Sequence, residues 1–437
     1  MIKINRLEFF IFWCIVLIQS LVWSRFLLSV SLWGIVIIAV FEIPKGKDSK
    51  MTFFQWVLNY LQFWHWQRTP QYKTLFGDKK AFIALTIPFF IVVLSGFWSE
   101  NLPYWLSRVQ LRLPFLLLPL AFSQLPPLSK KQFQSLLFTF FVVILVNCLL
   151  VLTNYALHFN AITQKLGQGQ AMPFLKEHIT FSIMAAYAFF IGIELWAADS
   201  FSEKKWVKNT VAALTLVLFI SLHIIAVRTG ILALYVCLIL RGLFFIVQSR
   251  RYIVGLLGFV VLGAIPMLSY QFLPSFQQRV NYAIWDFEQY KAGDPDAKSD
   301  SERIISLKIG AQIFSENKLF GVGYGDIETA MKPIYLEKYP NLDPKLPHNQ
   351  WLLTLMGLGV VGFVLSFAAF WYPLLVQSLF KDFLFLSLHL LVFTFSMTDI
   401  PFETSFSLTF YLFFVSLFLN FKKTRVNNEK STNHANL

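Results

Sequence analysis

The chain alternates between long apolar segments and shorter polar connections, and this pattern is the first guide to its fold. A helix that crosses a membrane needs roughly 17–25 mainly apolar residues. Twelve segments of the sequence approach or reach this length. They lie near residues 8–24, 26–43, 81–98, 106–124, 133–155, 179–198, 209–227, 230–248, 252–270, 350–376, 383–398 and 404–421. The pattern predicts an all-α polytopic integral membrane protein with about twelve transmembrane helices.

Two stretches depart from this regular alternation. Residues 53–66, FFQWVLNYLQFWHW, are aromatic and amphipathic, and Trp and Tyr favour the headgroup level. We therefore expect a helix that lies in the membrane interface. Residues 271–348, between the ninth and tenth spans, form the one long polar connection. A loop of this length is usually functional. We therefore divide the chain into spans over 1–270, a large loop over 271–348, spans over 349–421, and a tail over 422–437 that we expect to be disordered.

The large loop contains its own helical signals. Residues 299–317 predict an amphipathic helix with Ser301 or Asp300 as the N-cap and with apolar positions at 304, 307, 311 and 314. GVGYGD, residues 321–326, predicts a glycine-rich turn whose amides are able to face a phosphate. A second short helix is expected to start near Asp326 and to be disturbed by Pro333.

Composition and charge support a membrane location and fix an orientation. Charged residues make up 14% of the chain, against about 25% in soluble proteins. The net charge of +13 does not indicate nucleic-acid binding, because cytoplasmic loops of membrane proteins hold excess Lys and Arg. Placing both termini in the cytoplasm puts most basic clusters on that side, including Lys45, Lys47, Lys50, Lys130, Lys131, Lys204, Lys205, Lys208, Arg250, Arg251, Lys422 and Lys423. The loop 271–348 then lies on the outer side.

Three residues with chemical potential fall on that outer side. Arg228 lies where the seventh span turns into the eighth, Arg303 starts the loop helix, and His348 precedes the tenth span. Simpler roles exist for each: a headgroup anchor for Arg228, a solvated face for Arg303, and loop packing for His348. Yet a helix N-terminus disfavours an imidazolium, so His348 is suited to accept a proton.

Together these residue types fit a diphosphate-linked lipid substrate. Guanidinium groups bind phosphate oxygens through bidentate hydrogen bonds and keep their charge. Two of them are able to stabilise a leaving diphosphate without a metal ion. The three cysteines, Cys14, Cys148 and Cys237, lie in apolar runs without metal-ligand spacing, so we expect neither a metal site nor a cofactor.

Four segments carry a resemblance to a known family. LPHNQWLLTLMGLGVVGF (346–363) resembles the His-Asn signature and following glycine-bearing span of the bacterial O-antigen ligase and O-antigen polymerase superfamily. VRTGIL (227–232) resembles its Arg-x-Gly turn. ERIISLKIGAQIFSENKLFGVGYGD (302–326) resembles the loop segment with its second arginine, and DIPFETSFSLTFYLFF (399–414) its closing motif. The resemblance extends over residues 178–420.

This resemblance implies a GT-C-like membrane glycosyltransferase that acts at the periplasmic face of the bacterial inner membrane. Such an enzyme moves a glycan from undecaprenyl diphosphate to an acceptor, such as a lipid A core, without a metal and with inversion. Arg228 and Arg303 would bind the diphosphate, and His348 would activate the acceptor hydroxyl. His178, Asn349 and Glu403 match supporting positions, Asn349 either orienting His348 or capping the span.

Alternatives remain at this stage. The acceptor distinguishes a ligase from a repeat-unit polymerase, and a protein acceptor is a third variant. A transporter would place ionisable residues near the midplane of broken helices, often within a repeated architecture. The candidate residues lie at the outer boundary instead. Gly357, Gly359 and Gly362 in the tenth span are expected to allow close packing rather than ligand contact.

Overall fold

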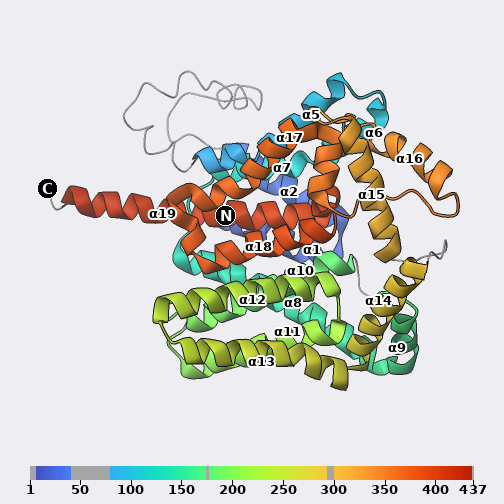
Figure 1. The fold of residues 1–437 in the computed structure, drawn as a ribbon. Coiled ribbons are helices and arrows are strands. Elements are labelled where there is room, and N and C mark those ends of the chain that lie inside the picture. Colours follow the sequence, from blue (N-terminus) through green and yellow to red (C-terminus); the bar gives the residue numbers. More distant parts are fainter. Residues whose placement is uncertain (1–5, 41–78, 174–176, 293–299, 436–437) are drawn as a thin grey trace.

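The computed structural model describes residues 6–40, 79–173, 177–292 and 300–435, and this part of the chain is built from helices without β-strands (Figure 1). Eight helical stretches are long and apolar enough to cross a membrane. They are Lys79–Phe97, which includes α5 (Ile87–Leu94) and η2 (Ser95–Phe97), with α8 (Lys130–Leu157), α10 (His178–Ala197), α11 (Lys205–Ile225), α12 (Arg228–Ser249), α13 (Tyr252–Phe272), α17 (Gln350–Leu375) and the Ser405–Lys422 part of α19 (Ser405–Ala435).

Three further helices are apolar but shorter: α1 (Arg6–Trp23), α2 (Arg25–Val40) and α18 (Phe383–Thr398). These helices and the eight longer stretches correspond to all the predicted spans except 106–124. A polytopic membrane protein is therefore confirmed, and the number of helices that cross the bilayer stays a prediction. The interfacial helix expected at 53–66 lies outside the described residues.

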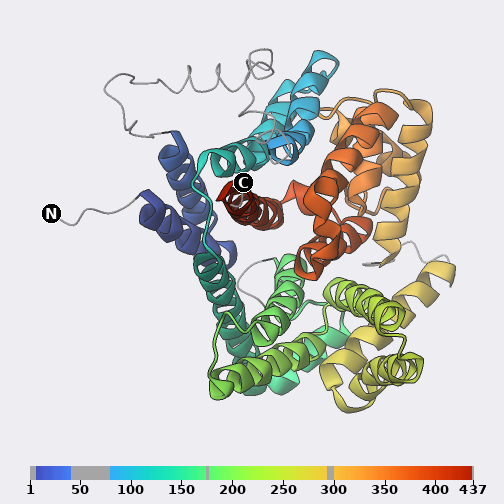
Figure 2. The ribbon, with the colours of Figure 1, turned by 90° about the vertical axis from the view of Figure 1, so that its left-hand side faces the viewer.

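Helix α19 forms the centre of the bundle (Figure 2). It contacts α1, α2, α7 (Leu113–Gln124), α8, α10 and α18, and 89% of its most apolar window is buried. Aromatic side chains fill this centre, where Phe410 and Phe414 pack against Phe140 and Tyr187. Helix α13 is at the opposite extreme, with 11% of its window buried. Its exposed apolar side chains suit contact with lipid.

The segment predicted as the fourth span is not one helix. It divides at Arg112 into α6 (Leu102–Leu111) and α7. Pro114 lacks the N–H that would continue the helix and instead suits the first turn of a new one. The division leaves Arg112 buried, 3% exposed, where its guanidinium reaches side chains from distant parts of the chain.

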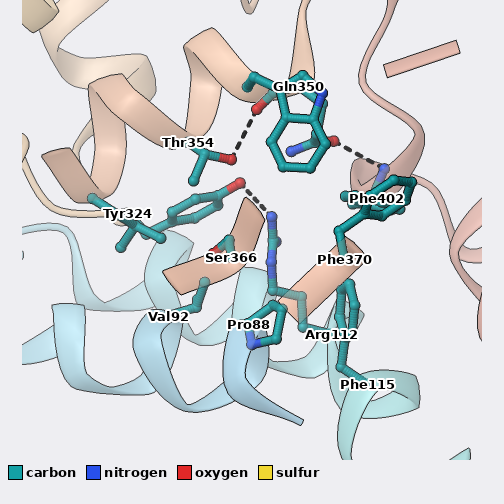
Figure 3. A pocket seen from close by; sticks show the side chains of 12 residues that line it. Pro88, Val92, Arg112, Phe115, Tyr324, Gln350, Thr354, Ser366, Phe370 and Phe402 are labelled. Atoms are coloured by element: carbon teal, nitrogen blue, oxygen red, sulfur yellow. Dashed lines mark hydrogen bonds between the residues drawn. The ribbon is translucent and has the colours of Figure 1, made fainter. Parts of the chain in front are cut away.

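Glu403, which the resemblance assigned to a supporting position, forms an ion pair with Arg112. Figure 3 shows Arg112 beside Tyr324. Arg112 donates to both Glu403 and the Tyr324 hydroxyl, and Tyr324 Oη donates to Glu403 Oε1 at 2.5 Å. Burial raises the pKa of the Glu403 carboxyl, but Arg112 and Tyr324 lower it more, so the net pKa is below its usual value. Glu403 thus joins η4 (Pro401–Glu403) to α7 and to the turn at Tyr324.

The described residues of the outer-loop region form three helices: α14 (Pro274–Ala292), α15 (Asp300–Glu316) and α16 (Ile327–Lys338). The predicted helix 299–317 is confirmed as α15, but the apolar face expected to be buried is wrong. Ile305, Ile309 and Ile313 are the buried apolar residues. The helix has two adjacent apolar stripes, and the sequence did not show which of them is buried. The helix already begins at Asp300, whose amide donates to Asp286 Oδ2 of α14 at 2.6 Å.

Helix α16 begins after Asp326, as predicted, but continues through Pro333 to Lys338. Asp326 fixes this region from outside the helix, because its carboxylate accepts the amides of Glu100 and Asn101 at 2.8 Å each. At the C-terminal side, α19 is helical to Ala435, and disorder of the tail over 422–437 stays a prediction. A nucleated helix gains one backbone bond per added residue, even in a polar segment.

The glycine-rich turn is held by the protein itself, so the suggestion that its amides face a phosphate is wrong. Val322 and Gly323 donate to the carbonyls of Met356 and Gly357 at 3.0 Å each, and the Gly325 amide donates to Ser99 Oγ at 3.1 Å. Helix α17 is interrupted at Gly359, where φ is +63° and a Cβ atom would lie 2.1 Å from the Leu319 carbonyl oxygen. A Cβ atom at Gly357 would lie 2.7 Å from the Ile327 side chain, so the close packing expected at Gly357 and Gly359 is confirmed. At Gly362 the nearest atoms are those of Leu358 in the same helix.

We predict that the Arg112–Glu403 pair is essential for stability. Replacing Glu403 with Leu leaves a buried, unpaired guanidinium, and loss of one partner of such a pair typically costs about 3–5 kcal/mol. Thermal unfolding of the purified protein in detergent should show this loss for Glu403→Leu and for Arg112→Met.

The double variant should be more stable than either single variant, since no fully buried charge is left unpaired. Arg108, whose Nη1 also contacts Glu403 Oε2 at 3.5 Å, is partly exposed to solvent. Glu337→Ala, at an exposed position of α16, is the matched control and should leave the midpoint unchanged. Single variants that unfold like the wild type would show that the pair does not hold these segments together.

Candidate functional site

Arg228 is placed by a tight reversal between α11 and α12. Ala226 adopts a left-handed conformation with φ of 53°, Val227 is extended, and α12 begins at Arg228. Two residues later, Gly230 lies against α10, where a Cβ atom would be 2.5 Å from Ser182 Oγ. The glycine of VRTGIL therefore lets the first turn of α12 approach α10, which fixes where Arg228 lies.

Arg228 and Arg303 are brought together by one carboxylate, Asp300. The two terminal nitrogens of Arg228 contact the two oxygens of Asp300, Nη2 at 2.9 Å from Oδ1. Arg303 Nη1 lies 3.8 Å from the same Oδ1. Asp300 is itself oriented by Asp286, a fully buried residue that accepts its amide and the Ser301 hydroxyl. A single anion therefore occupies the space between two cations from different helices.

A third arginine, Arg279 of α14, lies in the same charge cluster and was not identified from the sequence. Burial lowers the pKa of its guanidinium, and the charges of Arg228 and Arg303 lower it further. Its Nη1 donates to the carbonyls of Gly169 and Gln170 at 3.1 and 3.2 Å. Arg279 belongs to no quoted motif, so only the packing of α14 against α9 (Phe159–Gly167) and α15 reveals it.

His348 precedes α17, and its partner is Asp399 rather than Asn349. Its Nδ1 lies 3.2 Å from Asp399 Oδ1, which also accepts the Ile400 amide at 2.9 Å. Asn349 instead caps α17, because its Oδ1 accepts the amides of Trp351 and Leu352 at 3.0 Å each. The capping alternative for Asn349 is therefore confirmed.

Asp399 connects the histidine to the arginines. Burial raises the pKa of its carboxyl, whereas the His348 hydrogen bond and charge, the Ile400 amide and the charge of Arg303 lower it, with a net decrease. The carboxylate thus stays ionised beside the imidazole. The sequence offered a signal for this residue, since Asp399 opens the motif DIPFETSF, but Glu403 was chosen as its acidic position.

His178, the first residue of α10, also interacts electrostatically with this cluster, through Arg279, Arg303 and Asp399. The structure thus gathers four of the six sequence-selected residues, Arg228, Arg303, His348 and His178, at one end of the bundle. Asn349 and Glu403 hold the surrounding backbone. This end is opposite the C-terminal end of α19 (Figure 1).

The arrangement is suited to an anionic ligand. Arg228, His178 and Asp300 are the first residues of α12, α10 and α15, and helix N-termini carry partial positive charge. Within the described ranges, no three His, Cys, Asp or Glu side chains gather as metal ligands would. The guanidinium groups lie where they would bind phosphate in place of a metal ion. Independence from metal stays a prediction.

Comparison with known proteins supports the same interpretation. The O-antigen ligase family model matches residues 211–367, a segment that includes Arg228, Arg279, Arg303 and His348. This match confirms the resemblance to the O-antigen ligase and polymerase superfamily. Among curated proteins, none matches this chain.

We predict an acid-sensitive contribution from the His348–Asp399 pair. The lowered pKa of Asp399 means that its ionised form stabilises the fold above the ordinary carboxyl value of 3.8, and this contribution is lost as pH falls through the lower folded-state pKa. Asp399→Asn should therefore reduce stability near neutral pH by about 1–3 kcal/mol.

The measurement is thermal unfolding of both proteins from about pH 7 to about pH 3. The difference between wild type and Asp399→Asn should be constant at higher pH and should shrink below 3.8. Asp343→Asn, at an exposed position, is the control for loss of a carboxylate. A difference that grows on acidification would contradict the assigned ionisation.

Proposed function

We propose that this chain, which matches the O-antigen ligase family model over residues 211–367, is a membrane glycosyltransferase that transfers a glycan from undecaprenyl diphosphate to an acceptor hydroxyl. The acceptor is a lipid A core or a similar glycan, the reaction inverts the transferred sugar, and no metal ion is required. The observation that carries this proposal is the arrangement of Arg228 and Arg303 around one anion, with His348 on Asp399 beside them.

His348 acts as the general base in this scheme. Asp399 accepts from Nδ1 and so holds the proton there, which leaves Nε2 free to take the proton of the acceptor hydroxyl. The acceptor oxygen then forms a bond to the anomeric carbon. The bond from that carbon to the diphosphate oxygen breaks, and the electron pair leaves with the diphosphate. Attack from the side opposite the leaving group gives inversion.

Arg228 and Arg303 stabilise the charge that develops on the departing diphosphate. Both already contact a carboxylate, so their side chains are arranged for oxygen anions before substrate arrives. Binding of the diphosphate requires Asp300 to give up part of this contact. A diphosphate carries more charge than one carboxylate and presents more oxygens, which favours the exchange.

The proposed location is the bacterial inner membrane, with both termini in the cytoplasm and the site facing the periplasm. Support comes from the basic clusters in the predicted inner loops and from the position of the site at the end opposite the C-terminal end of α19. The partners are the lipid-linked glycan, the acceptor and the bilayer; nucleic acid is not among them.

A repeat-unit polymerase remains the second candidate, because the same donor chemistry would serve another lipid-linked glycan as acceptor. A transporter is disfavoured because the ionisable cluster lies at the first residues of α10 and α12 rather than in the middle of these spans.

We predict that Arg228→Ala, Arg303→Ala and His348→Ala each abolish measurable glycan transfer while leaving the protein in the membrane. Loss of a general base typically costs 10²–10⁴-fold, and each charge-assisted hydrogen bond contributes about 1.5–3 kcal/mol. Arg228→Lys should retain charge but lose bidentate contact, so an intermediate rate is expected. Arg251→Ala, at an exposed position between α12 and α13, is the matched control.

Glycolipid ladders from cells that lack the protein distinguish the candidates. A ligase predicts that no long glycan is attached to the lipid anchor while lipid-linked polymer accumulates; a polymerase predicts one attached repeat unit. Normal transfer by the His348→Ala variant, or accumulation of donor on the cytoplasmic side alone, would contradict a glycosyltransferase at this site.

A further inference from the structure

The turn that follows α15 changes abruptly from polar to apolar. Residues 316–318 are polar and exposed. The next two side chains, Leu319 and Phe320, are apolar, yet 67% and 59% of their surface is exposed. Two large apolar side chains exposed side by side on a turn are unfavourable in water. These two residues, here called the apolar tip, therefore need a partner outside the folded chain.

The apolar tip is hydrogen-bonded to the middle of α17 rather than to its end. Val360 donates to the Lys318 carbonyl at 2.8 Å, and Val361 donates to the Leu319 carbonyl at 3.3 Å. The break at Gly359, which frees these two amides, lies about 14 Å along the helix from its first residue. Freed amides in hydrocarbon require protein partners. The tip supplies these partners, and the contact places it level with the apolar part of α17.

The tip continues an apolar surface of the membrane helices. Beyond the break, Val361 and Val364 of α17 are each about half exposed. On its other side, Phe320 packs edge-on against Trp98, with ring centroids 6.2 Å apart. Trp98 follows Phe97, which ends the apolar stretch containing α5 and is 88% exposed. One apolar surface thus runs from the end of one membrane stretch, across the tip, to the middle of another.

We propose that the apolar tip is inserted into the membrane leaflet on the side of the charge cluster, so that lipid acyl chains cover Leu319 and Phe320. The flanking residue types fit such a boundary. Trp98 is of a type that favours the headgroup level, and the long side chain of Lys318 lets its ammonium reach the headgroups. Lipid is the occupant because the tip continues the surface of helices that themselves face the bilayer.

Insertion gives the outer loop an attachment to lipid in addition to its attachment to α17. Helix α15 ends at Glu316, next to the tip, and carries Arg303 near its other end. The tip therefore sets the depth of α15 relative to the bilayer. This inference stands apart from the proposed transfer reaction, since it concerns only whether lipid or water covers the tip.

The test measures what surrounds the tip in the full-length protein in phosphatidylcholine nanodiscs. Phe320→Cys is given a nitroxide spin label, which is selective because all three cysteines of the chain are buried. Power-saturation electron paramagnetic resonance then reports collisions with oxygen, which concentrates in hydrocarbon, and with a water-soluble nickel chelate. We expect frequent collisions with oxygen. Collisions with the chelate should be several-fold rarer than at an aqueous position, because polar solutes are excluded from hydrocarbon.

Two matched positions calibrate the measurement. Ser315→Cys, exposed on α15 shortly before the tip, reports water, and Val364→Cys, exposed on the apolar part of α17, reports lipid. Leu319→Cys repeats the measurement at the second residue of the tip. Both tip residues are largely exposed, so their replacement leaves the packed interior intact.

Collisions with the nickel chelate at position 320 as frequent as at position 315 would overturn the proposal, because the tip would then lie in water. Protection from both oxygen and the chelate would also overturn it, because protein would then cover the tip. A second copy of the chain as that cover would appear as a doubled protein mass in each nanodisc. A label at position 320 that behaves like the label at position 364 supports insertion.

Discussion

The site depends on one carboxylate that keeps two guanidinium groups together. Asp300 contacts Arg228 and Arg303, which come from different helices, and Arg279 adds a third positive charge nearby. Like charges repel at such proximity. The three guanidinium groups stay close together because other contacts fix the helices that carry them. An excess of positive charge at helix N-termini then favours an anion that is larger and more charged than a carboxylate.

Backbone hydrogen bonds between the segment that follows α15 and helix α17 fix these helices relative to one another. Residues 318–323 pair with α17 on both sides of Gly359, where Val360 donates to the Lys318 carbonyl at 2.8 Å. An interrupted helix in an apolar environment requires such partners for its free backbone groups. The same contact fixes the end of α15, and thus Arg303, relative to His348 at the start of α17.

The sequence predicted the helical architecture because apolar runs of this length allow little else in a membrane. It also indicated Arg228, Arg303 and His348, since each lies in a motif or at a helix boundary. It could not reveal Arg279 or the Asp399 contact, because these depend on which helices pack together. The division at Arg112 was missed for a related reason: a buried arginine in an apolar run is stabilised by Glu403, 291 residues away.

The residues outside the motifs therefore complete the chemistry that the motifs suggest. Asp399 orients the imidazole, Asp286 orients Asp300, and Glu403 holds the backbone on which these groups lie. None of these roles requires contact with a substrate.

The most direct test of the central claim is an electron cryomicroscopy structure of the protein with undecaprenyl diphosphate. We expect density for the two phosphates between the guanidinium groups of Arg228 and Arg303, with the Asp300 carboxylate withdrawn from at least one of them. Phosphate density at another face of the molecule, with Asp300 still holding both arginines, would contradict the account.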